Sequence, residues 1–268
     1  MRLTISLAQM DVIPSSPREN LEKGERFIAE AARRESDVIC FPEMWTTGFH
    51  WEKISRRAEE HDRVIERVGT LARKYGIWIV GSMPGLNEEG RVSNTFILFN
   101  SQGEPAGTYR KTHLFSLLQE DRYVAPGRSS CLVTTPWGPV GLAICYDIRF
   151  PELFRTYALK GAKLVFCPAA FPHPRLDHWK ILVRARAVEN QMYLVGINQV
   201  GSEEMGTHGR ITYFGHSVII DPWGKTVVQA GESQEMLLTA TIDPDLVDDI
   251  RAGMQVLRDR RPDIYELS

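Results

Sequence analysis

The sequence predicts an α/β fold in which a mixed sheet system is covered by helices on the outside. Short apolar runs typical of buried strands alternate along the chain with longer amphipathic stretches typical of helices. Turns with proline second and glycine fourth occur at residues 135–138 and 221–224, and they indicate hairpins among the strand–helix units. Neither a linker nor a low-complexity segment interrupts the 268 residues, so we expect one domain over residues 1–268.

The first half of the chain alternates between predicted strands and helices. Apolar alternation at residues 3–7 predicts the first strand. Residues 16–19 (SPRE) carry the signature of a helix start, with Ser16 as the cap of a capping box. A buried strand at residues 38–41 ends at Pro42, which has no N–H to donate. A helix at residues 55–75, strands at residues 77–81 and 94–99, a turn at residues 100–103 and another strand follow.

The second half repeats this alternation. A buried strand at residues 140–144 precedes a helix at residues 150–160, and Asp177 is the expected cap of a helix that runs to about residue 191. The remaining expected elements are strands at residues 164–167, 193–198, 217–220 and 237–242, and a short last helix after Asp243-Pro244.

The composition is that of an ordinary globular protein, with 43% apolar and 25% charged residues. The net charge of −2 and the absence of a basic stripe argue against a nucleic-acid partner. The chain contains no run of about 18 apolar residues, so we expect no membrane span. Its first residues read as a strand and not as a signal peptide.

Four cysteines occur, and none forms a C-x-x-C pair, so zinc and redox motifs are poorly supported. Free thiols suit a reducing compartment, and we therefore expect a cytoplasmic protein. Cys40 and Cys167 lie inside apolar strands and read as core residues, while Cys131 has no catalytic context.

Three predicted strand ends carry residues suited to chemistry, namely Glu43, Lys111 and Cys145. Cys145 lies at an elbow between a strand and a helix, where backbone N–H groups favour a thiolate and hold an oxyanion. Glu43 has apolar flanks, and burial would raise its pKa into the range of a general base. Each residue also has an ordinary interpretation: a core cysteine, a solvated loop carboxylate and a surface lysine.

Taken together, the motifs around these residues resemble those of the nitrilase, or carbon–nitrogen hydrolase, superfamily. The glutamate motif FPEMWTTGF covers residues 41–49, the lysine motif YRKTHLF covers residues 109–115, and the cysteine motif GLAICYDIRFPE covers residues 141–152. The resemblance covers nearly the whole chain and keeps the motif order. It implies a four-layer α-β-β-α sandwich and a catalytic triad of Glu43, Lys111 and Cys145, with no metal or organic cofactor.

The resemblance also implies a mechanism. Glu43 accepts the Cys145 proton, the thiolate attacks an amide, and Lys111 with the backbone N–H of Tyr146 faces the oxyanion. Ammonia leaves, and water then hydrolyses the thioester. Glu120, which precedes Pro126-Gly127, matches a second family glutamate that orients substrate or positions the lysine; a plain loop carboxylate is the alternative.

Within the superfamily, the omega-amidase branch is the most similar, on residues 145–152 (CYDIRFPE), 178–179 (HW) and 184–191 (RARAVENQ). That branch removes ammonia from 2-oxo acid amides such as 2-oxoglutaramate and 2-oxosuccinamate. Arg149 is positioned to bind the far carboxylate, unless it forms a structural ion pair with Glu152.

The loop at residues 169–175 offers further substrate contacts, with Phe171 as a pocket wall and His173 or Arg175 facing the oxo acid. A broader aliphatic amidase or an N-carbamoyl amino acid hydrolase with the same triad is the alternative. A nitrilase is disfavoured because Tyr146, and not tryptophan, follows the cysteine. A non-enzymatic binding scaffold is disfavoured because all three catalytic positions are intact.

The resemblance also implies a homodimer or higher homo-oligomer, whose partners otherwise are a small amide and water. The expected contact surfaces are the helices at residues 150–160 and 177–191 and the tail from about residue 245 to residue 268.

Overall fold

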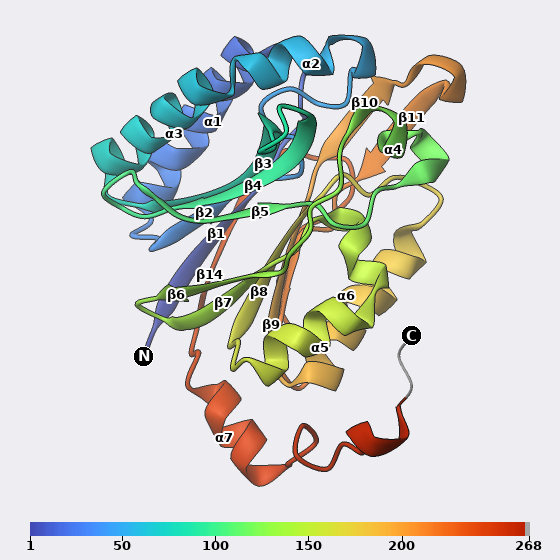
Figure 1. The fold of residues 1–268 in the computed structure, drawn as a ribbon. Helices are drawn as coiled ribbons and strands as arrows, with labels where there is room; N and C mark the ends of the chain where they lie inside the picture. Colours follow the sequence, from blue (N-terminus) through green and yellow to red (C-terminus); the bar gives the residue numbers. More distant parts are fainter. Residues whose placement is uncertain (266–268) are drawn as a thin grey trace.

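The computed structural model describes residues 1–265, so the last three residues of the predicted contact tail lie outside the described part. Figure 1 shows two large sheets packed face to face, with helices on the two outer sides. Helices α1 and α3 cover one sheet and α5 and α6 cover the other. This arrangement confirms the predicted four-layer α-β-β-α sandwich with mixed sheets.

The first sheet has the strand order β14-β1-β2-β3-β4-β5. Its centre is parallel, from β1 through β3, and its outer pairings are antiparallel. The strands are β1 (Leu3–Gln9), β2 (Val38–Cys40), β3 (Trp78–Leu86), β4 (Val92–Phe99), β5 (Pro105–Arg110) and β14 (Met236–Ile242).

The second sheet repeats this plan with the order β13-β12-β9-β8-β7-β6 and a parallel centre from β7 through β9. Hairpins β6–β7 and β12–β13 form at the two predicted proline–glycine turns. The strands are β6 (Cys131–Thr135), β7 (Gly138–Leu142), β8 (Leu164–Ala169), β9 (Tyr193–Asn198), β12 (Val218–Ile220) and β13 (Thr226–Gln229). A separate hairpin consists of β10 (Val200–Glu204) and β11 (Arg210–Phe214).

The helices fill the connections between strands. The α-helices are α1 (Pro17–Arg33), α2 (Trp51–Glu59), α3 (His61–Tyr75), α4 (Glu120–Tyr123), α5 (Pro151–Leu159), α6 (Leu176–Asn190) and α7 (Leu246–Gly253). Short 3-10 turns are η1 (Ser116–Leu118), η2 (Cys145–Arg149), η3 (Gly206–His208) and η4 (Pro262–Ile264). None of the helices in the described part of the chain has the length and apolar character needed to cross a bilayer.

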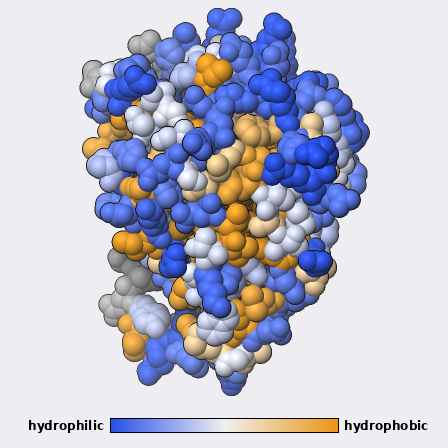
Figure 2. Space-filling model, turned by 180° about the vertical axis from the view of Figure 1, so that it is seen from behind, coloured by the Kyte–Doolittle hydropathy of each residue, from blue (hydrophilic) through white to orange (hydrophobic). Residues whose placement is uncertain are grey.

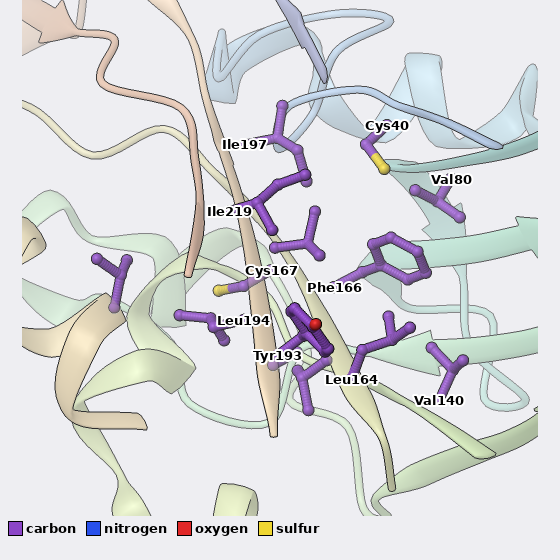
Figure 3. Close-up of a cluster of buried hydrophobic side chains, with 14 of the residues drawn as sticks. Cys40, Val80, Val140, Leu164, Phe166, Cys167, Tyr193, Leu194, Ile197 and Ile219 are labelled. Carbon is purple, nitrogen blue, oxygen red and sulfur yellow. The ribbon is translucent and has the colours of Figure 1, made fainter. Parts of the chain in front are cut away.

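The main core lies between the sheets, because alternate strand residues point to opposite faces. On β2, Val38 and Cys40 join this core, whereas Ile39 packs with the helices outside. Figure 3 shows Cys40 and Val80 opposite Phe166 across the sheet interface. Cys167 is also buried, which confirms the prediction of two core cysteines.

The predicted capping box at residues 16–19 is wrong. Ser16 precedes α1 but makes no side-chain cap bond, and its Oγ lies 3.4 Å from the Pro14 carbonyl oxygen. The polar contact in this first turn comes from buried Asn20, which donates to the carbonyl oxygens of Ile13 at 2.8 Å and Thr46 at 3.0 Å. The start of α1 is therefore tied to the loop that follows Glu43 and not to its own cap.

Two helix boundaries also differ from the prediction. The single helix expected at residues 55–75 is two helices, α2 and α3, with Glu60 between them. Asp177 lies in the first turn of α6, and Arg175 is the cap position. Side-chain preferences alone place such boundaries only to within a few residues.

Candidate active site

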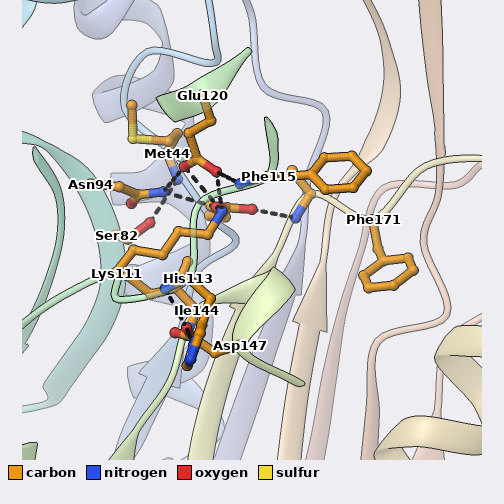
Figure 4. Close-up of polar contacts among 12 residues, drawn as sticks. Met44, Ser82, Asn94, Lys111, His113, Phe115, Glu120, Ile144, Asp147 and Phe171 are labelled. Atoms are coloured by element: carbon orange, nitrogen blue, oxygen red, sulfur yellow. Dashed lines mark hydrogen bonds and ion pairs between the residues drawn. The ribbon is translucent and has the colours of Figure 1, made fainter. Parts of the chain in front are cut away.

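The three predicted strand ends meet at one edge of the sandwich, where Glu43, Lys111 and Cys145 line the same cavity. Figure 4 draws the buried polar contacts around Lys111 and Glu120. Lys111 directly follows β5, and its Nζ lies 2.7 Å from Glu43 Oε1 and 2.8 Å from Glu120 Oε2. All three side chains are almost inaccessible to solvent. The structure thus brings together Glu43, Lys111 and Glu120, and the lysine bridges two carboxylates.

Backbone and amide donors hold the two carboxylates in place. Asn94 on β4 donates to Glu43 Oε1 at 2.8 Å, and the Ala170 N–H donates to Glu43 Oε2 at 3.1 Å. The Phe115 N–H donates to Glu120 Oε2 at 2.8 Å. Sequence reasoning did not single out Asn94; the available signal was an amide inside an otherwise apolar strand.

Cys145 begins the η2 turn, three residues after β7 ends at Leu142. Its φ of +43° lies in the left-handed region, a strained conformation for a residue with a Cβ. Cys145 is 8% exposed, and its thiol lies next to Glu43 and Ala170 in one cavity lining. Cys145 and Tyr146 are the first residues of the turn, where N–H groups have no acceptor within the turn itself. The predicted elbow therefore exists, and its thiol faces Glu43.

A third buried carboxylate, Asp147, lies beneath this turn and was missed by the sequence reasoning. It accepts the Ile144 N–H at 2.8 Å and the Tyr109 hydroxyl at 2.8 Å. It also accepts the His113 N–H at 3.1 Å and contacts His113 Nδ1 at 2.7 Å. Asp147 thus joins the nucleophile turn to the lysine motif, and His113 has the structural role that its type suggests.

Burial controls the protonation of the cluster. Desolvation raises the pKa of Glu43, although the Lys111 charge opposes this change. Burial also raises the pKa of the Cys145 thiol, and the Glu43 charge adds to it. For Lys111, burial lowers the pKa, but the charges of Glu120 and Glu43 outweigh burial and raise it well above its ordinary value. The resting cluster therefore holds a thiol, a charged lysine and a carboxylate ready to accept a proton.

A small cavity opens beside the cluster, with a free volume of about 30 Å³, little more than a water-sized molecule occupies. Its polar side is formed by Glu43, Lys111, Glu120 and Cys145. Its remaining walls are mainly apolar, and they consist of Phe49, Phe115, Leu118, Ala170, Met205 and Tyr213. The apolar walls therefore lie directly around the Cys145 thiol.

The predicted substrate-binding residues lie around this cavity, not in its lining. The Arg175 guanidinium lies 5.5 Å from the centre of the Phe115 ring, which is itself a cavity wall. The Arg149 guanidinium lies 5.9 Å from the centre of the Tyr146 ring, and its side-chain partner is His178 at 3.2 Å and not the Glu152 considered as an alternative.

The 169–175 loop divides its residues between the core and the surface. The ring of Phe171 is buried against Trp179 and Phe214, and at this strand end Ala170 lines the cavity. His173 is exposed and packs edge-on to Phe214, 5.4 Å between ring centres. None of the apolar walls was predicted from the sequence, and the most distant of them along the chain come from Phe49 and from the β10–β11 hairpin.

Comparisons with known proteins identify a carbon–nitrogen hydrolase family over nearly the whole chain. The family model for "Carbon-nitrogen hydrolase" matches residues 4–252. A 2-oxoglutaramate amidase from Bacillus subtilis is 36% identical, over 99% of this chain and 100% of its own length. An omega-amidase from Xenopus tropicalis is 32% identical, over 99% of this chain and 98% of its own length.

Among solved structures, a carbon-nitrogen hydrolase from Helicobacter pylori superposes with a TM-score of 0.93 at 25% identity. The superposition covers 98% of this chain and 97% of that one. The arrangement of layers and sheets is therefore common to both chains, and the Glu43–Lys111–Cys145 cluster lies within the matched region.

Proposed function

Since the chain belongs to the carbon–nitrogen hydrolase family, whose members act on bonds other than peptide bonds, we propose that it hydrolyses the terminal amide of 2-oxo acids. The substrates we propose are 2-oxoglutaramate and 2-oxosuccinamate, and the products are the 2-oxo diacid and ammonia. The observation that carries the proposal is the buried contact of Cys145 with Glu43, beside a lysine held between two carboxylates.

In the first step, Glu43 accepts the Cys145 proton as the amide enters, and the sulfur attacks the carbonyl carbon. The negative charge that develops on the carbonyl oxygen faces the Lys111 ammonium and the Tyr146 N–H. Glu120 keeps Lys111 charged and in place through contacts at 2.8 and 3.0 Å. The lysine can thus turn toward the oxyanion without leaving its second carboxylate.

Collapse of the tetrahedral intermediate breaks the carbon–nitrogen bond. Glu43 donates its proton to the departing nitrogen, which leaves as ammonia, and a thioester on Cys145 remains. Glu43 then takes a proton from water, the resulting hydroxide attacks the thioester, and the acid leaves as Cys145 regains its proton. Every proton passes through Glu43, so the reaction requires no metal or organic cofactor.

The far carboxylate of the substrate is proposed to meet Arg175 or Arg149 at the cavity mouth. Arg175 stacks on Phe115, and Arg149 lies near Tyr146, whose ring centre is 4.9 Å from that of Phe115. A planar guanidinium supported by an aromatic face binds a carboxylate in a bidentate manner. His173 and Phe171 complete the predicted loop, with His173 at the surface and Phe171 supporting the Arg149 guanidinium at 5.4 Å.

We also propose that the chain is a single domain and forms a homodimer in the cytoplasm. One family match over residues 4–252 supports the single domain, and four free thiols support a reducing compartment.

Apolar side chains gather near the centre of the face seen in Figure 2. On α6, Ile181 is 65% exposed and Val188 is 44% exposed beside a groove along β12, which favours α6 as a contact surface. Light scattering tests this assembly, and a strict monomer would refute it.

Ammonia release tests the proposed reaction. The parent protein is expected to release ammonia from 2-oxoglutaramate, and Cys145→Ala is expected to lose at least about 10⁴-fold in kcat. Cys131→Ala is the matched control, because Cys131 lies at the second sheet's edge strand, outside the cavity lining. Turnover of N-carbamoyl amino acids or simple aliphatic amides in preference to oxo amides would favour the alternative functions.

A further inference from the structure

Glu203 on the β10–β11 hairpin is a buried acid with no place in the mechanism above. It is 5% exposed, and its Oε1 accepts the Phe49 N–H at 2.8 Å across 154 positions of sequence. Its Oε2 accepts the Tyr213 hydroxyl at 3.4 Å. Both partners are walls of the active-site cavity. One carboxylate therefore joins two apolar walls that come from distant parts of the chain.

The backbone beside Phe49 fits closely around this carboxylate. Gly48 has a φ of +64°, and a Cβ there would lie 3.0 Å from Glu203 Oε1. The Gly48 N–H closes a turn onto the Met44 carbonyl oxygen at 2.8 Å, directly after Glu43. The loop that carries Glu43 is thus fastened at its far end by Glu203, and a glycine is required for this approach.

A third wall belongs to the same hairpin. Met205 lies two residues beyond Glu203, lines the cavity, and packs in one apolar cluster with Phe49 and Tyr213. Figure 1 shows the β10–β11 hairpin at the same end of the molecule as α2 and α4. Glu203 is consequently the polar link within an otherwise apolar side of the cavity.

We propose that Glu203 is a positioning residue that holds the Phe49, Met205 and Tyr213 walls against the site, and that this clamp selects for the acyl chain of 2-oxo acid amides. The preference for 2-oxo acid amides depends on the proposed function, whereas the role of Glu203 in holding the three walls does not. These walls line the cavity beside Cys145, so the link to Glu203 determines how closely they pack against the acyl chain of a bound substrate.

The ionisation of Glu203 supports the clamp. Burial raises the pKa of Glu203 to about 7, although its bonds to Phe49 and Tyr213 oppose the rise. The ionisable groups on the elements packed against it are Tyr213 and Arg210 on β11, and Glu43 and His50 on the loop. The ionised form accepts charge-assisted bonds from both walls, so the clamp tightens as pH rises through this range.

Three variants test the clamp. Glu203→Gln keeps the size and removes the charge, Tyr213→Phe removes one of the two bonds, and Glu204→Gln is the matched control because Glu204 is exposed on the same strand. For Glu203→Gln we expect the KM for 2-oxoglutaramate to rise about tenfold, with little change in the KM for propionamide. Tyr213→Phe should raise the ratio of the KM for 2-oxoglutaramate to the KM for propionamide by about threefold, and Glu204→Gln should leave this ratio unchanged. Equal losses on both substrates, or a parent-like ratio, would overturn the selection.

Alkylation of Cys145 by iodoacetamide tests the clamp independently of any substrate. Loosened walls expose the thiol, so Glu203→Gln should be alkylated several-fold faster than the parent. The ratio of the two rates should rise with pH around the Glu203 pKa of about 7, and Glu204→Gln should behave as the parent does. An unchanged or slower alkylation would overturn the clamp. If the parent fails to turn over 2-oxoglutaramate, the proposed function fails, while alkylation still decides on Glu203.

Discussion

Two buried carboxylates on either side of Cys145, Glu43 and Asp147, have opposite surroundings. Glu43 faces the cavity and is held by the Lys111 ammonium and the Asn94 amide, with Cys145 in the same cavity lining. Asp147 lies under the turn and has no exposed surface. Its donors are two backbone N–H groups and the side chains of Tyr109, Thr112 and His113.

The difference in surroundings suits one carboxylate to proton transfer and the other to supporting the fold. A carboxylate surrounded by fixed donors has no free lone pair for a reacting proton, so Asp147 supports the turn. A carboxylate beside a thiol and an open cavity exchanges protons with whatever enters, so Glu43 is suited to be the base. We expect substitutions at the two sites to fail in different ways.

The largest expected effect is the loss of kcat when Glu43 is substituted. Glu43→Gln keeps the shape and the contact with Asn94 but removes the proton acceptor, so kcat should fall about 10³-fold. This loss should far exceed the effect of the fall in the thermal midpoint that results when the new amide N–H faces the Ala170 N–H. Steady-state ammonia release and thermal unfolding measure the two quantities. Glu19→Gln, on the exposed first turn of α1, is the control and should match the parent. A variant that keeps most of its activity would remove Glu43 as the base.

Substitution of Asp147 should mainly lower the stability of the folded protein. Asp147→Asn places an amide N–H against one of the N–H donors, and leaving such a buried group unpaired should lower the free energy of unfolding by about 2 kcal/mol. For a chain of this size, the corresponding fall in the thermal midpoint is about 4–8 °C, with kcat lower by about tenfold. Calorimetry measures the shift, and exposed Asp121→Asn is the control. Full stability with lost activity would place Asp147 in the chemistry and contradict the comparison.

With propionamide as the substrate, whose KM is expected to depend little on Glu203, the pH dependence should report Glu43. Since burial raises its pKa above the ordinary value, kcat/KM should fall with decreasing pH through an acid limb that lies above about pH 4.5. The folded protein also binds this proton more tightly than the unfolded chain, so the contribution of Glu43 to stability decreases as pH rises through the same window. Rate profiles of the parent and Glu43→Gln measure the limb, which the variant should lack. A parent limb at the ordinary carboxylate pKa would show that burial does not tune this group.

The smallest expected effect concerns the cavity mouth, beyond both carboxylates. Arg175→Lys keeps the charge but loses the planar fork, so the KM for 2-oxoglutaramate should rise about fivefold at unchanged kcat. Arg149→Lys should show a similar change only if that residue shares the carboxylate. Kinetics with propionamide, which has no carboxylate, provide the reference. A rise in KM for both substrates would assign the arginine to packing and not to recognition.

Much of the site was predictable because its signals are local. The positions of Glu43, Lys111 and Cys145 follow from where apolar runs end, and strand ends of a layered α/β fold converge on one edge. The two proline–glycine turns likewise predicted their hairpins correctly. The capping box at Ser16 failed because tertiary contacts of Asn20 occupy that turn.

The sequence by itself predicted the fold class and the buried strands, because burial and turn geometry are encoded in neighbouring residues, and the resemblance of its three motifs to a known family led to the proposed triad. Only the tertiary structure decided which side chains surround that triad. Asn94, Asp147 and Glu203 are polar residues whose partners lie tens to hundreds of positions away, and no spacing along the chain identifies such pairs. Their roles follow from the packing of two sheets and one hairpin, which brings distant backbone donors to the same carboxylate.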